Sequence, residues 1–99
     1  MDAFGLREEV TAFIIEKAKA YGMAKVVLFG SRATGCFSEK SDIDLAILGS
    51  SVDSFMASLE EECPTLLSFD FVILSQGISK ELEDRIDKEG VVLYEVCKL

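Results

Sequence analysis

Two aspartates one residue apart, Asp42 and Asp44, are the strongest chemical signal in the sequence. They begin an apolar segment with the character of a strand, and side chains alternate between the two faces of a strand. Both carboxylates would therefore lie on one face, where they repel each other unless a positive charge lies between them. Magnesium binds one or two carboxylates together with substrate phosphates, and two such ions can stabilise the attacking and leaving oxygens of a transfer reaction. The alternative is a pair of solvated acids at the exposed start of a strand.

A glycine and a serine lie upstream of this pair, directly after the apolar run Val26 to Phe29. Gly30 permits close approach of the backbone to a ligand, and Ser31 offers a hydroxyl and an amide to the β- or γ-phosphate of a nucleotide. A short helical turn from Ser31 to Thr34 would direct its free amides at such an anion. A glycine–serine pair alone predicts only a turn, so the downstream aspartates decide its interpretation.

Three other polar residues are candidates for the same site. Asp70 is a lone charge in an apolar segment, where burial without a partner is costly. Metal ligation, general-base catalysis on an incoming hydroxyl, or a strand end that reaches solvent would each explain it. Arg32 would pair with a phosphate or ribose, or with acids on the surface. Ser41 would support the nucleotide or cap the loop.

The arrangement of Gly30-Ser31, ten intervening residues and Asp42-Ile43-Asp44 resembles the signature of the DNA polymerase β-like nucleotidyltransferases. The small size, the strand with Asp70 and the ending EGVVLYE are similar to the minimal nucleotidyltransferase branch of that superfamily. The resemblance implies metal-dependent transfer of a nucleoside monophosphate, AMP from ATP, to an acceptor hydroxyl.

The resemblance also implies a role for each candidate residue. The catalytic and metal-binding group, with two Mg²⁺ ions, would be Asp42, Asp44 and Asp70. The nucleotide would contact Gly30, Ser31, Arg32 and Ser41.

Members of the minimal branch are often encoded beside a HEPN-domain toxin, for which the small protein is the antitoxin. The resemblance therefore implies a HEPN-domain partner as the acceptor, through a tyrosine hydroxyl, and a homo- or hetero-oligomer. A sheet face without a covering helix would be the docking surface. The alternative is an inactive binding module that masks a partner protein, in which the motif serves only the fold.

The composition limits the classes of protein to which the chain can belong. Its 99 residues are expected to form a single domain, residues 1–99, and the net charge of −8 argues against direct binding of nucleic acid. The absence of histidine excludes catalysis by Ser-His or Cys-His pairs. Three widely spaced cysteines, no run of about 20 apolar residues and no signal-peptide pattern predict a cytoplasmic protein outside membranes.

The elements that must position the candidate residues follow from hydrophobic periodicity and turn signals. We expect helices over 4–21, over 31–34, after a cap at Asp53 or Ser54, and from Ser79 to Gly90. Strands are expected over 26–29, 42–48, 66–74 and 91–96. The first two strands are joined too closely for a crossover helix and should pair antiparallel. This order predicts an α+β nucleotidyltransferase fold with a mixed sheet, helices mainly on one face and the aspartate face at least partly open.

Overall fold

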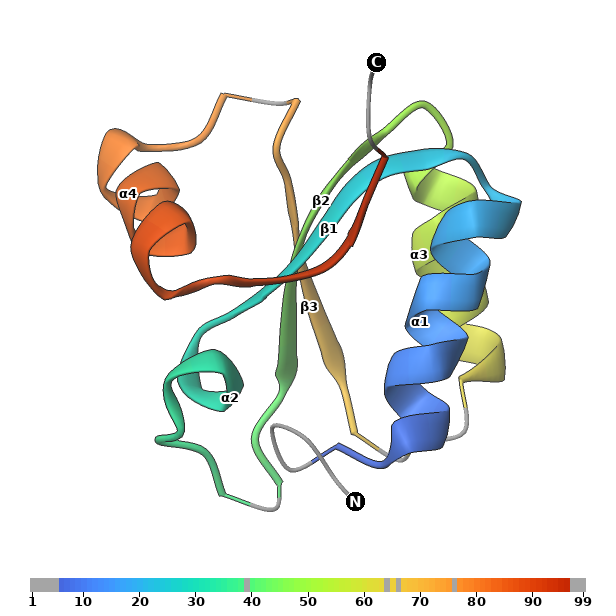
Figure 1. The fold of residues 1–99 in the computed structure, drawn as a ribbon, viewed down its shortest axis with the longest axis horizontal. Coiled ribbons are helices and arrows are strands. Elements are labelled where there is room, and N and C mark those ends of the chain that lie inside the picture. Colours follow the sequence, from blue (N-terminus) through green and yellow to red (C-terminus); the bar gives the residue numbers. More distant parts are fainter. Residues whose placement is uncertain (1–5, 39, 64, 66, 76, 97–99) are drawn as a thin grey trace.

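The computed structural model describes residues 6–38, 40–63, 65, 67–75 and 77–96. Helices and strands alternate along the chain, as Figure 1 shows. Their bounds are α1 Glu8–Ala20, β1 Met23–Phe29, α2 Ser31–Thr34, β2 Ile43–Gly49, α3 Val52–Glu62, β3 Phe69–Ile73, α4 Lys80–Glu89 and β4 Val91–Glu95. No helix among the described residues is long and apolar enough to cross a membrane.

The strands form one mixed sheet in the order β3-β2-β1-β4. β1 pairs antiparallel with both β2 and β4, whereas β2 and β3 are parallel. The antiparallel β1–β2 pair confirms the expectation from the short connection. The parallel β2–β3 pair requires a crossover, which α3 supplies.

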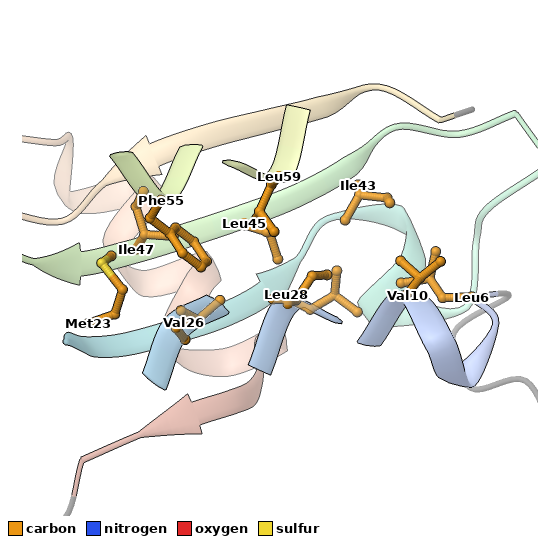
Figure 2. Close-up of a cluster of buried hydrophobic side chains, with 12 residues drawn as sticks. Leu6, Val10, Met23, Val26, Leu28, Ile43, Leu45, Ile47, Phe55 and Leu59 are labelled. Atoms are coloured by element: carbon orange, nitrogen blue, oxygen red, sulfur yellow. The ribbon is translucent and has the colours of Figure 1, made fainter. Parts of the chain in front are cut away.

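The larger core lies between the sheet and the two helices α1 and α3 (Figures 1 and 2). The inward side of α1 consists of Val10, Ile14 and Ala18, which recur at every fourth residue and are buried. α3 adds Phe55 and Leu59 to the same layer. The sheet contributes alternate residues of its central strands, namely Met23, Val26, Leu28, Ile43, Leu45 and Ile47 (Figure 2).

The opposite face of the sheet is covered in part by α4 (Figure 1). Val27 of β1 and Ala46 of β2 are Cα partners and form a second buried cluster with Ile86 of α4. The amphipathic pattern of α4, with Leu82 and Ile86 on one side, gives that helix an apolar stripe which must be buried. The expectation of a sheet face without a covering helix is therefore wrong, because α4 covers part of the second face.

Several boundaries differ from those expected from the sequence. α1 begins at Glu8 rather than at residue 4, and residues 4 and 5 lie outside the described part of the chain. β1 starts at Met23, since pairing with β2 extends it beyond the apolar run. Ser51, not Asp53 or Ser54, precedes α3. The third strand is shorter than 66–74 and spans Phe69–Ile73, with residue 66 outside the described part.

The start of α4 matches the sequence expectation in detail. The Ser79 hydroxyl oxygen accepts a hydrogen bond from the backbone N–H of Leu82 at 3.2 Å. This bond satisfies one of the amides that lack a partner in the first turn of a helix. It thereby helps to hold the helix that covers the second face.

We predict that Ser79→Ala lowers the free energy of unfolding by about 1 kcal/mol, because the helix loses its capping oxygen. Urea unfolding followed by circular dichroism measures the change. Ser51→Ala is the matched control, since Ser51 precedes α3 without a side-chain capping bond, and its effect should stay below about 0.5 kcal/mol. Equal losses in the two variants would show that the Ser79 cap does not stabilise the protein.

Candidate functional site

Asp44 and Asp70 lie side by side on neighbouring strands. They are Cα partners in the parallel β2–β3 ladder, two residues before the partners Ala46 and Val72. Because side chains alternate along a strand, both carboxylates share a face with the apolar cluster under α4. Asp70 is exposed and Asp44 half-buried, so this end of the face is open beyond the helix.

Asp42 is also exposed and directly precedes the first residue of β2. Its charge acts on Asp44, as does that of Asp70. The pKa of Asp44 lies above its ordinary value because burial disfavours the charged carboxylate and because Asp70 and then Asp42 repel it, while Arg85 opposes this with a positive charge. The three predicted carboxylates thus form one electrostatically coupled group.

Gly30 supplies the space that Asp44 occupies. Its φ of 75° lies in the region that residues with a side chain rarely adopt. A Cβ atom at this position would collide with Oδ2 of Asp44. Gly30 therefore has two structural reasons to be glycine, and it brings the turn before α2 directly against the carboxylate group.

Arg32 lies in the interior rather than on the surface, with only 1% of its area exposed. Its Nε and Nη2 both donate to the Ser41 carbonyl oxygen, at 3.1 and 2.8 Å, and its guanidinium lies over the Phe37 ring, 5.1 Å from the centroid. These two hydrogen bonds, made by a charged donor group, connect α2 to the residue directly before Asp42. The expected surface position of this arginine is therefore wrong, because its side chain is buried.

The two serines of the predicted set lie on either side of the chain reversal before β2: Ser31 begins α2, and Ser41 lies near the end of the loop that joins α2 to β2. Ser31 is half-buried and is the first residue of α2, next to Gly30. Ser41 is half-buried as well, and its hydroxyl oxygen accepts a hydrogen bond from the backbone N–H of Ser38 at 2.9 Å. The loop-capping alternative for Ser41 is therefore realised, while a contact with a nucleotide stays a prediction.

Among the described residues, no three or more Cys, Asp or Glu side chains converge closely enough to hold a metal ion by themselves. The donor set nevertheless fits magnesium, which is usually bound by one or two carboxylates and completed by phosphates and water. The carboxylates repel one another at Asp44, and the backbone of Gly30 packs against the same side chain. Both observations favour Asp44 as the centre of a cation site. Asp42, Asp44 and Asp70 are the residues that would hold it.

Two of the cysteines are described, and both are free. Cys36 is exposed, whereas Cys63 is half-buried at the end of α3. Burial, with a smaller contribution from Glu9, raises the pKa of the Cys63 thiol to about 11, so this thiol is a poor nucleophile. Neither cysteine contributes to the carboxylate group.

Sequence reasoning missed Arg85, whose positive charge acts on Asp44 from α4. A signal was present, because Leu82 and Ile86 define the inward side of the helix and Arg85 flanks it. The sequence did not show that α4 packs on the aspartate face rather than beside α1 and α3.

We predict that Asp44→Asn stabilises the metal-free protein at neutral pH. A carboxyl with a raised pKa binds its proton more tightly when folded, so stability falls as pH rises from the ordinary value of 3.8 to the folded-state value. Asp44→Asn has no carboxyl to ionise at this position, so it does not lose this stability as the pH rises. Thermal unfolding in EDTA should therefore show a gain at pH 7 that shrinks on acidification and vanishes below about pH 3.8.

Asp53→Asn, on α3 at the other face of the sheet, is the control and should give no such pH-dependent gain. A stability difference between parent and Asp44→Asn that does not change with pH would show that the carboxylate group is not under electrostatic strain.

We further predict that Gly30→Ala costs about 2 kcal/mol or more of stability, because backbone strain adds to the collision with Asp44. Gly35→Ala is a matched control: its φ of 86° is also positive, but a Cβ there would meet nothing within 4 Å. That variant should lose only about 1 kcal/mol. Chemical unfolding measures both, and equal losses would show that the contact with Asp44 has no energetic weight.

Comparison with solved structures finds the same fold in proteins of low sequence identity. A toxin–antitoxin crystal structure with AMP-PNP aligns with a TM-score of 0.68 at 21% identity, over 87% of this chain and 73% of that one. A mutant of the toxin–antitoxin pair MntA–HpeT aligns with a TM-score of 0.67 at 19% identity, with the same coverage of 87% and 73%. A nucleotidyltransferase fold from Sulfolobus solfataricus aligns with a TM-score of 0.51 at 21% identity, over 86% and 76%.

No protein of curated function matches the sequence significantly. The family model described as polymerase beta, nucleotidyltransferase, in contrast, matches residues 13–98. The matched part contains the glycine–serine turn, the paired aspartates and the strand with Asp70, together with every strand of the sheet. The chain therefore belongs to the polymerase β-type nucleotidyltransferase family.

Proposed function

We propose that this protein transfers a nucleoside monophosphate, AMP from ATP, to a hydroxyl group of a partner protein. The observation that carries the proposal is the grouping of Asp44, Asp70 and Asp42 at one end of the sheet, with Gly30 packed on Asp44. Membership of the nucleotidyltransferase family supports the reaction class. A similar fold in a toxin–antitoxin complex with AMP-PNP supports an adenine nucleotide as substrate.

In the proposed reaction the acceptor oxygen attacks the α-phosphorus of ATP. The bond from that phosphorus to the oxygen bridging to the β-phosphate breaks, and pyrophosphate leaves with the electron pair. Asp42 and Asp44 would hold divalent cations, two Mg²⁺ ions in the proposed state, which neutralise charge on the phosphates. Asp70, exposed beside Asp44, would complete the carboxylate group and take the proton from the acceptor hydroxyl.

The remaining predicted residues shape the nucleotide site. Ser31 and Gly30 would present the turn before α2 to the phosphates. Ser41, in the loop that joins α2 to β2, would line the nucleotide. Arg32 would contribute through its bonds to the Ser41 carbonyl, which fix the backbone directly before Asp42.

The proposed acceptor is a toxin with a HEPN domain, modified on a tyrosine. The strongly acidic charge, −8 over 99 residues, disfavours nucleic acid as acceptor. Two of the similar structures are toxin–antitoxin complexes, which supports a toxin partner and a hetero-oligomer. The proposed location is the cytoplasm. Addition of AMP would place a bulky anionic group on the toxin and silence it.

An inactive module that masks the same partner is the second candidate function. In such a module the glycine–serine turn and the paired aspartates would serve only the fold. Magnesium-dependent nucleotide binding separates the two functions, because a masking module needs neither.

We predict that co-expression with the product of the neighbouring reading frame, followed by incubation with ATP and Mg²⁺, adds the mass of one AMP residue to the partner. Asp44→Asn should lower this transfer about 100-fold or more, because a charged ligand for the cation is lost while the fold remains. Intact-mass spectrometry of the partner measures both. Asp53→Asn, an exposed acid on α3, should leave the transfer at the parent level.

An unlabelled partner that still forms a complex with the parent would favour the masking module. Equal labelling by the parent and by Asp44→Asn would remove the carboxylate group from the mechanism. No complex and no labelling together would exclude the antitoxin function.

A further inference from the structure

The C-terminal half of α4 lies next to the carboxylate group. Ile86 is buried against Val27 and Ala46, and Ala46 is two residues beyond Asp44 on the same face of β2. A Cβ atom at Gly90, the residue after α4, would collide with Cγ1 of Val27. The end of α4 thus packs on Val27 of β1. Val27 lies two residues before Phe29, and Phe29 is the Cα partner of Asp44.

Arg85 extends from this fixed segment into solvent. Its side chain is 65% exposed, and its Nε lies 3.8 Å from Oε2 of Glu89, one turn later. An exposed pair at this distance holds a guanidinium only weakly, so Arg85 can leave Glu89 for a stronger anion. Its charge already acts on Asp44 in the absence of any ligand.

The proposed reaction needs such a charge. Three carboxylates and a triphosphate carry more negative charge than two divalent cations neutralise, and charge builds up on the leaving pyrophosphate. Arg32 has two nitrogens committed to the Ser41 carbonyl and is buried. Of the cations on the described part of the chain, Arg85 is the one whose charge acts on Asp44.

We propose that Arg85 is a further residue of the nucleotide site, whose guanidinium binds the β- or γ-phosphate and stays with the leaving pyrophosphate. The inference rests on the proposed function, since it assumes that a nucleoside triphosphate occupies the carboxylate end of the sheet. The fork of donors in an arginine fits two phosphate oxygens, and Glu89 releases it when the nucleotide arrives.

Calorimetric titration of the whole chain with AMP-PNP and Mg²⁺ tests the proposal. The affinity for AMP, which lacks the β- and γ-phosphates, is measured by competition with AMP-PNP. Arg85→Gln should weaken AMP-PNP binding about tenfold, the effect of one charge-assisted contact, and change AMP binding by less than about twofold. The variant should fold, because the side chain is exposed. Lys80→Gln removes the same charge at the opposite end of α4 and should leave both affinities within about twofold of the parent.

Glu89→Gln adds a test in the opposite direction, since it removes the competing carboxylate and should hold or increase the affinity for AMP-PNP. If Arg85→Gln and Lys80→Gln weaken AMP-PNP binding equally, the proposed phosphate contact is excluded. It is excluded as well if Arg85→Gln lowers the affinities for AMP and AMP-PNP by the same factor. A parent protein that binds AMP-PNP while Arg85→Gln binds it equally well would overturn this inference alone. A parent that binds no nucleotide with Mg²⁺ would overturn the proposed function as well.

Discussion

The pairing register of the central strands is the constraint on which the site depends. Asp44 faces Phe29 across the antiparallel β1–β2 pair and Asp70 across the parallel β2–β3 pair. A slip of one residue in either pairing would move the carboxylate to the other face and Leu45 out of the core. The buried residues that fix the register, Leu28 and Leu45 among them, therefore also fix where the charge lies.

The sheet packs on an apolar core on one face and carries mutually repelling carboxylates on the other. The large core between the sheet and α1 and α3 is closed and apolar, while the carboxylate group repels itself at the open end of the second face. Clustered carboxylates of this kind are typical of functional sites, where a ligand offsets their electrostatic repulsion. A divalent cation with oxygen ligands is such a ligand. The buried Arg32 adds rigidity, because it ties the loop before Asp42 to α2.

Much of this could be predicted from the sequence, because local patterns determined it. The alternation that buries Ile43 and Leu45 on one face of β2 and leaves Asp44 on the other depends on near neighbours. The turn at Gly30 and the cap at Ser79 are local as well, and the short connection required an antiparallel β1–β2 pair. The burial of Arg32 could not be predicted, since its partner, the Ser41 carbonyl, is nine residues away and meets it only in the fold. The position of Arg85 depends on the face that α4 covers, which is a property of the whole sheet.

We propose that Asp42, Asp44 and Asp70 form one cation and nucleotide site beside Gly30. A crystal structure with AMP-PNP and Mn²⁺ in place of Mg²⁺ tests it most directly, because anomalous scattering locates the manganese independently of the refined coordinates. We expect manganese between the carboxylates of Asp42 and Asp44, with the triphosphate at the turn of Gly30 and Ser31. Manganese and nucleotide bound elsewhere, with the carboxylates contacting only water, would contradict it.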